Sequence, residues 1–267
     1  WCLVWAGPNR TKPMNISSRE ILKPVVLRLN AVPLYRFLST IMTDLTADTP
    51  LPRKKILDCG AGGTLPPLTV FAAQDMDAWG IDISDAQLRQ ARALCKTKNV
   101  ALRLHRGDMR RLPFADARFD YVYEHYAMCH LSKSDTNRAT QEMVRVLKPG
   151  GRYFLGLISA ETWPPLGRER EPGEFGFEEG ESATRHTVFT DREADRLLAR
   201  WQVVRKERSI TWLSSQMEPL TEMDWQDLYH DIQPDCTEES WMAGYDRRTT
   251  NARYVHTFYI LEKPVRA

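Results

Sequence analysis

Lys54-Lys55-Ile56-Leu57-Asp58-Cys59-Gly60-Ala61-Gly62-Gly63-Thr64 is the stretch that decides the fold. A short apolar strand runs into an acidic residue, Asp58, and then into a glycine-rich turn. Glycine allows the backbone to adopt positive φ and lets a ligand lie directly against the main chain. The stretch therefore predicts a ligand-binding turn at the end of a buried strand.

The spacing of the glycines and the acid indicates which ligand this turn takes. A dinucleotide turn needs glycine at the first, third and sixth positions, but the sixth position counted from Gly60 is Leu65. A phosphate loop needs Gly-Lys-Ser/Thr, which does not follow here. A carboxylate at the strand end would repel a pyrophosphate, whereas it suits a ligand that carries an ammonium group. S-adenosylmethionine (SAM) has such an amino acid end and no phosphate.

Length and composition are ordinary for a globular protein. The chain has 267 residues, enough for one large domain or two small ones, with 42% hydrophobic and 27% charged residues. The formal net charge is +2, from 37 basic and 35 acidic residues. This balance gives no broad field for nucleic acid or an anionic membrane, so we expect neither as a partner.

The cysteines and the apolar runs indicate the cellular compartment of the protein. Five scattered cysteines without a C-x-x-C pair indicate reduced thiols in a cytoplasmic protein. No apolar run approaches membrane-spanning length. We treat residues 1–13 as an extension before Met14 or an expression remnant, and exclude them from the fold.

The pattern of apolar residues divides the remaining chain into a helical cap over 14–53 and a larger domain over 54–267. In the cap, a first apolar stripe follows Ser18 and a second follows Pro33, both at helical spacing. In the domain, strands and helices alternate with short connections, which implies a mainly parallel sheet with helices on both faces. The expected strands cover 56–57, 77–81, 100–104, 119–123, 152–158, 202–204 and 254–261.

Two insertions interrupt this alternation. The first insertion spans 159–185; within it, residues 161–182 contain Pro164-Pro165, Pro172-Gly173 and many charges, which predicts a long surface loop, either a lid or a mobile insertion. Residues 211–250 are rich in Trp, Met and Tyr. They either line an apolar acceptor pocket or form the core of a small helical insertion, and the second interpretation is favoured.

Acidic and polar residues follow four of the expected strands, and in a parallel sheet these strand ends meet at one edge. Besides Asp58, Asp82 can accept hydrogen bonds from both ribose hydroxyls of a nucleoside. Asp108 can accept from an adenine amino group, and Met109 offers a backbone N–H and an apolar wall. Tyr123-Glu124-His125 borders the point where a methyl group would leave. Singly, each acid could be only a cap or turn residue.

These residues together resemble the core of the class I SAM-dependent methyltransferases, in particular the small-molecule group often called type 11. The resemblance covers 54–158. It rests on the turn from Leu57 to Gly63, on Gly80-Ile81-Asp82-Ile83-Ser84, on Gly107-Asp108-Met109 with Leu112-Pro113-Phe114, on Phe119-Asp120, and on Leu147-Lys148-Pro149-Gly150-Gly151. One departure is Thr64, where many relatives have glycine.

The resemblance implies a Rossmann-like, doubly wound α/β fold with seven strands, the last of them antiparallel. It further implies that the helices before residue 46 cover the cofactor, and that 159–185 and 211–250 help to form the acceptor pocket. The implied SAM contacts are Asp58, Gly60, Ala61, Gly62, Asp82, Ile83, Asp108, Met109 and Glu124.

Methyl transfer from a sulfonium is a direct displacement in which alignment supplies most of the catalysis. A general base is needed only if the acceptor must lose a proton, and the candidates are Glu124, His125 and His130, of which the two histidines are preferred. Both histidines could instead line the cofactor or be structural. Cys129 and His130 with Glu124 and His125 lack a second ligand pair at finger spacing, so we expect no metal.

The sequence thus predicts an enzyme that methylates a small organic acceptor. A non-catalytic SAM-binding partner or regulatory module is the alternative, and a nicotinamide-dependent oxidoreductase is a weaker one. Neither the acceptor, the attacking atom nor the oligomeric state follows from the sequence.

Overall fold

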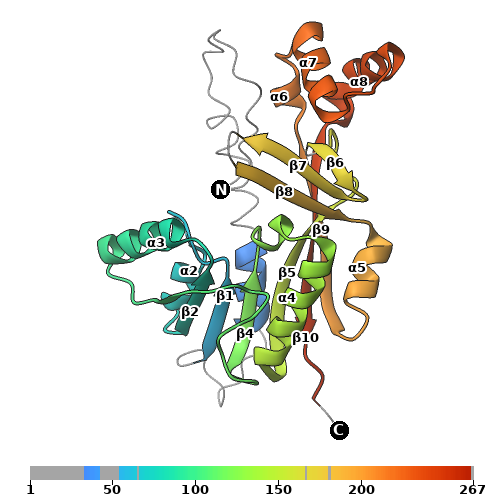
Figure 1. The fold of residues 1–267 in the computed structure, drawn as a ribbon. Coiled ribbons are helices and arrows are strands. Elements are labelled where there is room, and N and C mark those ends of the chain that lie inside the picture. Colours follow the sequence, from blue (N-terminus) through green and yellow to red (C-terminus); the bar gives the residue numbers. More distant parts are fainter. Residues whose placement is uncertain (1–32, 43–53, 65, 166, 180–181, 266–267) are drawn as a thin grey trace.

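The computed structural model describes residues 33–42, 54–64, 66–165, 167–179 and 182–265 (Figure 1). The expected extension at 1–13 and the expected first helix after Ser18 lie outside the described residues. The division of the chain into a cap and a larger domain therefore stays a prediction.

A mainly parallel sheet forms the centre of the molecule (Figure 1). Five strands pair in parallel in the order β3-β2-β1-β4-β5. Beyond β5, β10 runs antiparallel to both β5 and β9. The seven expected strands are thus present, mainly parallel and with an antiparallel last strand, within a sheet of ten strands. The bounds are β1 (Lys55–Cys59), β2 (Asp77–Asp82), β3 (Arg103–Arg106), β4 (Phe119–Glu124), β5 (Leu147–Ser159), β9 (Gln202–Trp212) and β10 (Arg253–Glu262).

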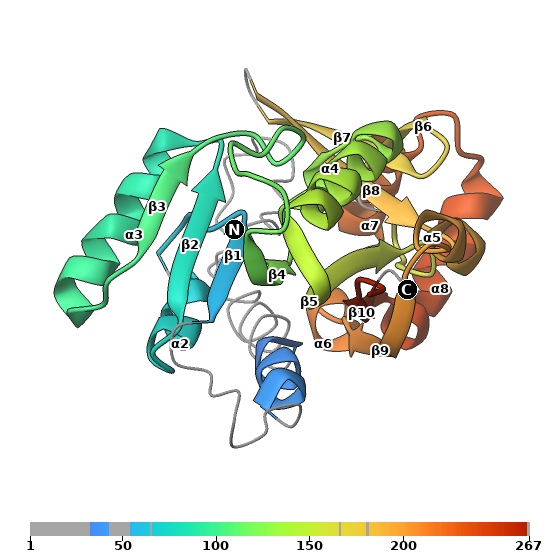
Figure 2. The ribbon, with the colours of Figure 1, turned by 90° about the horizontal axis from the view of Figure 1, so that it is seen from below.

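Helices cover both faces of the sheet, as the alternation predicts (Figure 2). On one face, α4 (Lys133–Val146) and α5 (Asp191–Leu197) bury apolar residues against side chains of β1, β4, β5 and β10. On the other face, the helix over 33–42 and α2 (Leu68–Ala72) do the same. α3 (Asp85–Lys98) packs against β2 and β3, and begins at Ser84, whose hydroxyl accepts from the N–H of Gln87.

The helix over 33–42 is fixed to its sheet face by Phe37. The ring of Phe37 is fully buried and lies 6.0 Å from Phe71, 5.9 Å from Tyr123 and 5.5 Å from Phe154, between centroids. Burying a phenylalanine side chain contributes about 1.5–3 kcal/mol. The second apolar stripe is therefore a helix, as expected, and it covers the middle of the sheet.

The expected surface loop over 161–182 is wrong, because strands occupy much of it. β6 (Arg168–Glu171), β7 (Glu174–Glu179) and β8 (Ser182–Phe189) form an antiparallel meander. β8 joins the central sheet beside the end of β5, where Ile158 pairs with Val188 in parallel. The prolines and charges of the segment are typical of a loop, but its short strands are stabilised because β8 pairs with the end of β5.

The insertion after β9 is helical, with α6 (Ser214–Met217), α7 (Glu222–Ile232) and α8 (Glu238–Asn251). Its own core contains Trp225, Leu228, Tyr229, Ile232 and Trp241, all buried. The favoured interpretation of the aromatic residues there, as the core of a small helical insertion, agrees with this packing.

Both insertions emerge at the same edge of the sheet. β9 runs parallel to β5 because each is antiparallel to β10, so the two strands end at one edge. β1 and β4 also end there, since they are parallel to β5. In Figure 1 the meander and the three helices accordingly gather at one end of the molecule. β9 is much longer than expected and extends to Trp212.

Candidate functional site

The glycine turn adopts the backbone conformation that its residues predict. Gly60 has φ of 109° and Gly63 has φ of 93°, a region that side-chain-bearing residues rarely enter. A Cβ atom on Gly60 would lie 2.3 Å from that of Ala127. Gly60 therefore serves both the turn and the close approach of the segment that follows β4.

The N–H groups of this turn are already used within the protein. Gly60 and Ala61 donate to the carbonyl of Ile81 (2.8 and 3.0 Å), and Gly63 donates to that of Gln87 (3.0 Å). Gly62 donates to the carboxylate of Asp82 (3.0 Å). A phosphate site needs such groups to be available to the ligand, so the turn is poorly suited to a phosphate. This geometry weighs against a dinucleotide cofactor.

Asp82 stands at the end of β2, where it connects the turn to the start of α3. One carboxylate oxygen accepts from the N–H of Gly62 and the other accepts from the N–H of Ser84 (2.8 Å). Each oxygen has a further lone pair for a ligand. The side chain is half-buried, so a ligand can reach it, and the two N–H groups fix its orientation.

Two buried carboxyl groups, Asp58 and Glu124, lie beside the turn. Burial raises the pKa of Asp58 well above its usual value, and the nearby charges of Glu124 and Asp82 add to this shift. Burial also raises the pKa of Glu124, to about 7, although the N–H groups of Met128 (2.7 Å) and Ala127 (3.0 Å) donate to it and oppose the shift.

Each of these carboxyl groups keeps one oxygen without a protein partner. Asp58 Oδ2 and Glu124 Oε2 are buried and have no hydrogen-bond partner among the described residues. An uncompensated buried carboxylate is costly, and a cation beside the pair removes that cost. The arrangement is therefore suited to an ammonium group.

An apolar wall adjoins the acids. Ile83, next to Asp82, is 63% exposed, which is unusual for a large aliphatic side chain at the end of a buried strand. Ala61, by contrast, is buried. Met109 packs partly buried against the core cluster that includes Ile81. The predicted cofactor contacts of Ile83 and Met109 stay predictions.

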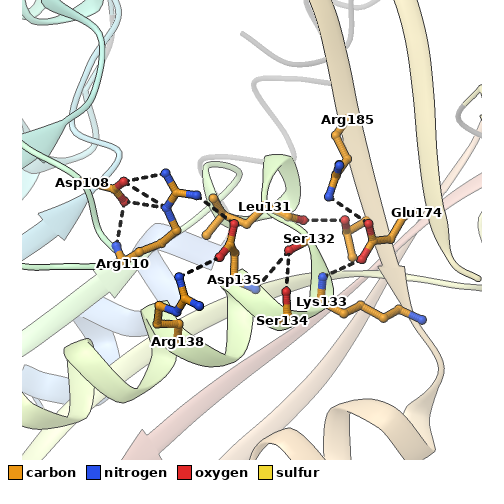
Figure 3. A network of polar contacts seen from close by, with 11 residues as sticks. Asp108, Arg110, Leu131, Ser132, Lys133, Ser134, Asp135, Arg138, Glu174 and Arg185 are labelled. Carbon is orange, nitrogen blue, oxygen red and sulfur yellow. Dashed lines mark hydrogen bonds and ion pairs between the residues drawn. The ribbon is translucent and has the colours of Figure 1, made fainter. Parts of the chain in front are cut away.

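Asp108 is held by arginine in this structure (Figure 3). Its two oxygens accept from the guanidinium of Arg110 at distances between 2.6 and 3.0 Å, and Arg110 also binds Asp135 at 2.8 Å. Arg110 keeps the pKa of Asp108 below its usual value. The predicted contact between Asp108 and an adenine amino group stays a prediction. It would use a lone pair of the Asp108 carboxylate that Arg110 leaves available.

The same network continues to the β6–β8 meander (Figure 3). Glu174 on β7 accepts from the backbone N–H of Lys133 at 2.7 Å and pairs with Arg185 on β8 at 2.9 Å. The start of α4 is thereby tied to the loop after β3 on one side and to the meander on the other.

The two predicted catalytic histidines lie in different clusters. The ring of His125 lies on the sheet face of the 33–42 helix, 6.3 Å from Tyr123 and 6.0 Å from Phe154. His130 Nδ1 instead contacts the carbonyl oxygen of Arg185 at 2.7 Å, and its ring lies 5.1 Å from that of His186. Burial lowers the pKa of His130. Only His125 shares the face of Asp58.

Sequence reasoning missed His256, which lies next to His125. The two rings are 5.2 Å apart, and His256 is fully buried. His125 Nδ1 and His256 Nε2 lie 2.9 and 2.8 Å from the point where a Cβ of Gly156 would stand, so the missing side chain of Gly156 leaves room for both imidazoles. Burial lowers the pKa of His256 well below 6.5, so the ring is neutral at neutral pH. A histidine inside the apolar strand 254–261 was the available signal.

Two negative findings apply to the described ranges. They contain no group of three or more His, Cys, Asp and Glu side chains that could hold a metal ion. None of their helices combines the length and the apolar character needed to cross a membrane.

Comparison with known proteins agrees with this geometry. Residues 56–151 match a family described as "Methyltransferase domain". The ubiquinone/menaquinone biosynthesis C-methyltransferase UbiE of Cupriavidus metallidurans is 35% identical over 118 residues, which are 43% of this chain and 47% of that protein. Sterol methyltransferase-like 2 of Botryococcus braunii is 39% identical over 115 residues, which are 42% and 28% of the two chains. The match thus spans about half the length of UbiE and less of the sterol enzyme.

The fold matches solved structures over most of the chain. A SAM-dependent methyltransferase from Methanosarcina mazei superimposes with a TM-score of 0.59 at 18% identity, covering 85% of this chain and 98% of that one. At this identity the similarity establishes the Rossmann-like methyltransferase fold, as the sequence predicts.

Proposed function

We propose that this chain, as a class I SAM-dependent methyltransferase, transfers the methyl group of SAM to a small organic acceptor. The observation that carries the proposal is the arrangement of groups at the edge where β1, β2 and β4 end. There the N–H groups of the glycine turn are bonded within the protein, and Asp82 is half-buried. Two buried carboxyl groups, Asp58 and Glu124, lie beside them. The relatives are a ubiquinone/menaquinone biosynthesis C-methyltransferase and a sterol methyltransferase-like protein, which supports an apolar acceptor.

SAM fits these residues by three observations. The orphaned oxygens of Asp58 and Glu124 are placed for the ammonium group of its amino acid end. Asp82 has lone pairs for the ribose hydroxyls, and the exposed Ile83 offers an apolar surface to the adenine. The N–H groups of the glycine turn are used within the protein, which suits a ligand without phosphate, as SAM is.

When bound, SAM supplies an electrophilic methyl group on a sulfonium that departs as a neutral thioether. The protein therefore needs to supply alignment, which can contribute about 7–11 kcal/mol in favourable cases. In the proposed assignment, Asp58 and Glu124 fix the amino acid end and Asp82 fixes the nucleoside end. The helix over 33–42 and the strands β4, β5 and β10 border the acceptor and exclude water from it.

A base is needed only if the acceptor must lose a proton, as a hydroxyl-bearing ring does. His125 is the proposed base, because it follows β4 on the same face as Asp58 and is packed against aromatic rings. His256, neutral beside it, is placed to orient His125 or to share the proton. His130 is assigned a structural role, since it holds the carbonyl of Arg185.

We expect the affinity for S-adenosylhomocysteine, the product of transfer, to rise with pH between about 5 and 7. Glu124 has a pKa of about 7 without ligand, so below that pH binding of an ammonium must displace its proton. The affinity gain approaches about tenfold per pH unit well below the pKa and levels off above it. Isothermal titration calorimetry at several pH values measures it.

Glu124→Gln should flatten this pH dependence, whereas Glu239→Gln, which changes an exposed glutamate of α8, should leave it as in the wild type. Stability gives a second readout. The pKa of Glu124 is higher in the folded than in the unfolded protein. Its contribution to the free energy of unfolding is therefore fully present at pH values below its usual pKa of 4.5 and is lost as pH rises through about 7. An unchanged slope in Glu124→Gln would refute this role.

The proposed activity is tested by a screen of small acceptors, read by the S-adenosylhomocysteine that is released. Turnover with at least one apolar or aromatic acceptor is expected, and His125→Asn should reduce kcat for a hydroxyl acceptor by about 10²–10⁴-fold. The alternative is a non-catalytic SAM-binding module, which predicts tight binding of SAM and no turnover over the whole panel of acceptors.

A cytoplasmic location is proposed from the scattered cysteines.

A further inference from the structure

A cavity of about 170 Å³ lies between the helix over 33–42 and the strands β5, β10 and β9. Its apolar wall consists of Phe154, Phe258 and Ile260. Its polar wall includes Arg36 from the helix together with Arg205 and Glu207 from β9. The cavity thus combines a flat apolar surface with charged groups along one side.

The strand register places this cavity on the sheet face of Asp58. Asp58 pairs with Tyr123, Tyr123 with Phe154, Phe154 with Ile260, and Ile260 with Arg205. Residues paired across a sheet project to the same face. Neighbouring strands are about 4.8 Å apart, so Phe154 is about 10 Å from Asp58 along this row.

His125, on the sheet face of Asp58, lies next to a residue that lines the cavity. Its ring centroid is 5.3 Å from that of Phe258, and Phe258 lines the cavity. An elongated acceptor whose reacting atom is next to His125 would therefore extend its far end into the cavity.

The charges around the cavity leave an excess of positive charge. Glu207 is the carboxylate that both arginines contact, at 2.6 Å from Arg205 and 3.5 Å from Arg36. Both arginine side chains are about half exposed, at 45% and 56%, so a ligand can reach them. Arg208 also lines the cavity, but its guanidinium binds Glu161 and Asp191 at 2.6 and 2.7 Å.

Resting on the function proposed above, we propose that this cavity binds the carboxylate-bearing far end of the methyl acceptor. The carboxylate would lie between Arg36 and Arg205, because planar guanidinium groups favour bidentate pairing with carboxylates. The apolar part would lie against Phe154 and Phe258. Since a cavity of about 150 Å³ accommodates benzene, this one admits a single ring or a group of that size. The acceptor class is thus an amphipathic carboxylic acid.

The test uses 4-fluorobenzoate as a probe in a fluorine-19 NMR titration of the whole chain, with S-adenosylhomocysteine present. The neutral 4-fluorobenzamide is the matched ligand. We expect 4-fluorobenzoate to bind more tightly than the amide. Arg205→Gln should weaken its binding by about tenfold, the effect of losing one hydrogen bond to a charged group. Arg200→Gln, an exposed arginine in the turn before β9, should have no effect.

Glu207→Gln separates ligand binding from a structural role. If the arginines serve the ligand, removing the carboxylate that competes for them should tighten 4-fluorobenzoate binding, by about twofold or more. If the ion pair only holds β9 to the helix, Glu207→Gln and Arg205→Gln should change binding in the same direction, and the inference would be wrong. Equal binding of acid and amide would overturn it as well.

Calorimetry with S-adenosylhomocysteine on the same samples distinguishes this inference from the proposed function. Binding of the nucleoside without binding of 4-fluorobenzoate overturns the carboxylate site and leaves the methyltransferase function standing. Binding of 4-fluorobenzoate without binding of the nucleoside overturns both the function and the assignment of the cavity to its acceptor.

Discussion

Asp82→Ala is expected to lower the affinity for S-adenosylhomocysteine by about 100-fold. The carboxylate is held by the N–H groups of Gly62 and Ser84 at 3.0 and 2.8 Å, and it is placed to accept from both ribose hydroxyls. A hydrogen bond to a charged group contributes about 1.5–3 kcal/mol, so losing two such bonds accounts for this factor. Calorimetric titration of the variant measures the change.

The neighbouring variant Asp85→Ala serves as the control. Asp85 is the first residue of α3, its side chain is 51% exposed, and it pairs with the exposed Arg106. Its replacement should leave nucleoside affinity within about a factor of two, as for other exposed ion pairs. If a folded Asp82→Ala protein bound the nucleoside as tightly as Asp85→Ala, the assignment of Asp82 to the ribose would be incorrect.

Gly60→Ala should be the most damaging small substitution in the turn, costing about 3 kcal/mol of folding stability or more. Two penalties add together. The φ of 109° is strained for any side-chain-bearing residue, and the new methyl group would lie 2.3 Å from the Cβ of Ala127. Because the turn would have to shift, nucleoside binding should also be lost. Urea unfolding followed by circular dichroism, together with calorimetry, tests both effects.

Gly150→Ala isolates the cost of backbone strain. Gly150 also has positive φ, 73°, but a Cβ there would meet only Val265, at an ordinary 3.5 Å. We expect a loss of about 1 kcal/mol with nucleoside affinity unchanged. Equal destabilisation by the two substitutions would show that the contact with Ala127 contributes nothing. The double variant Gly60→Ala with Ala127→Gly should recover part of the lost stability.

The edge that carries Asp58, Asp82 and Asp108 could be predicted because its information is local. Asp58 and Asp82 stand at the ends of β1 and β2, Asp108 comes two residues after β3, and parallel strands end at one edge, so the sheet alone brings them together. The capping box at the start of α5 is equally local, since its two members, Thr190 and Glu193, are three residues apart. Such signals need only a few consecutive residues.

The features that sequence reasoning missed depend on contacts between distant segments. The β6–β8 meander exists because β8 pairs with the end of β5, which no pattern within 161–182 reveals. His256 reaches His125 only through the antiparallel pairing of β10 with β5. The cavity brings together Arg36 and Arg205 from opposite ends of the chain. The ion pair between Asp108 and Arg110 is local, but its anchoring by Asp135 is not.

A crystal structure with bound S-adenosylhomocysteine tests the central claim most directly. The account predicts the nucleoside at the carboxyl ends of β1, β2 and β4, with its amino group within about 3.2 Å of Asp58 or Glu124 and both ribose hydroxyls within that distance of Asp82. A nucleoside bound elsewhere, or Asp58 and Asp82 facing different cavities, would contradict it.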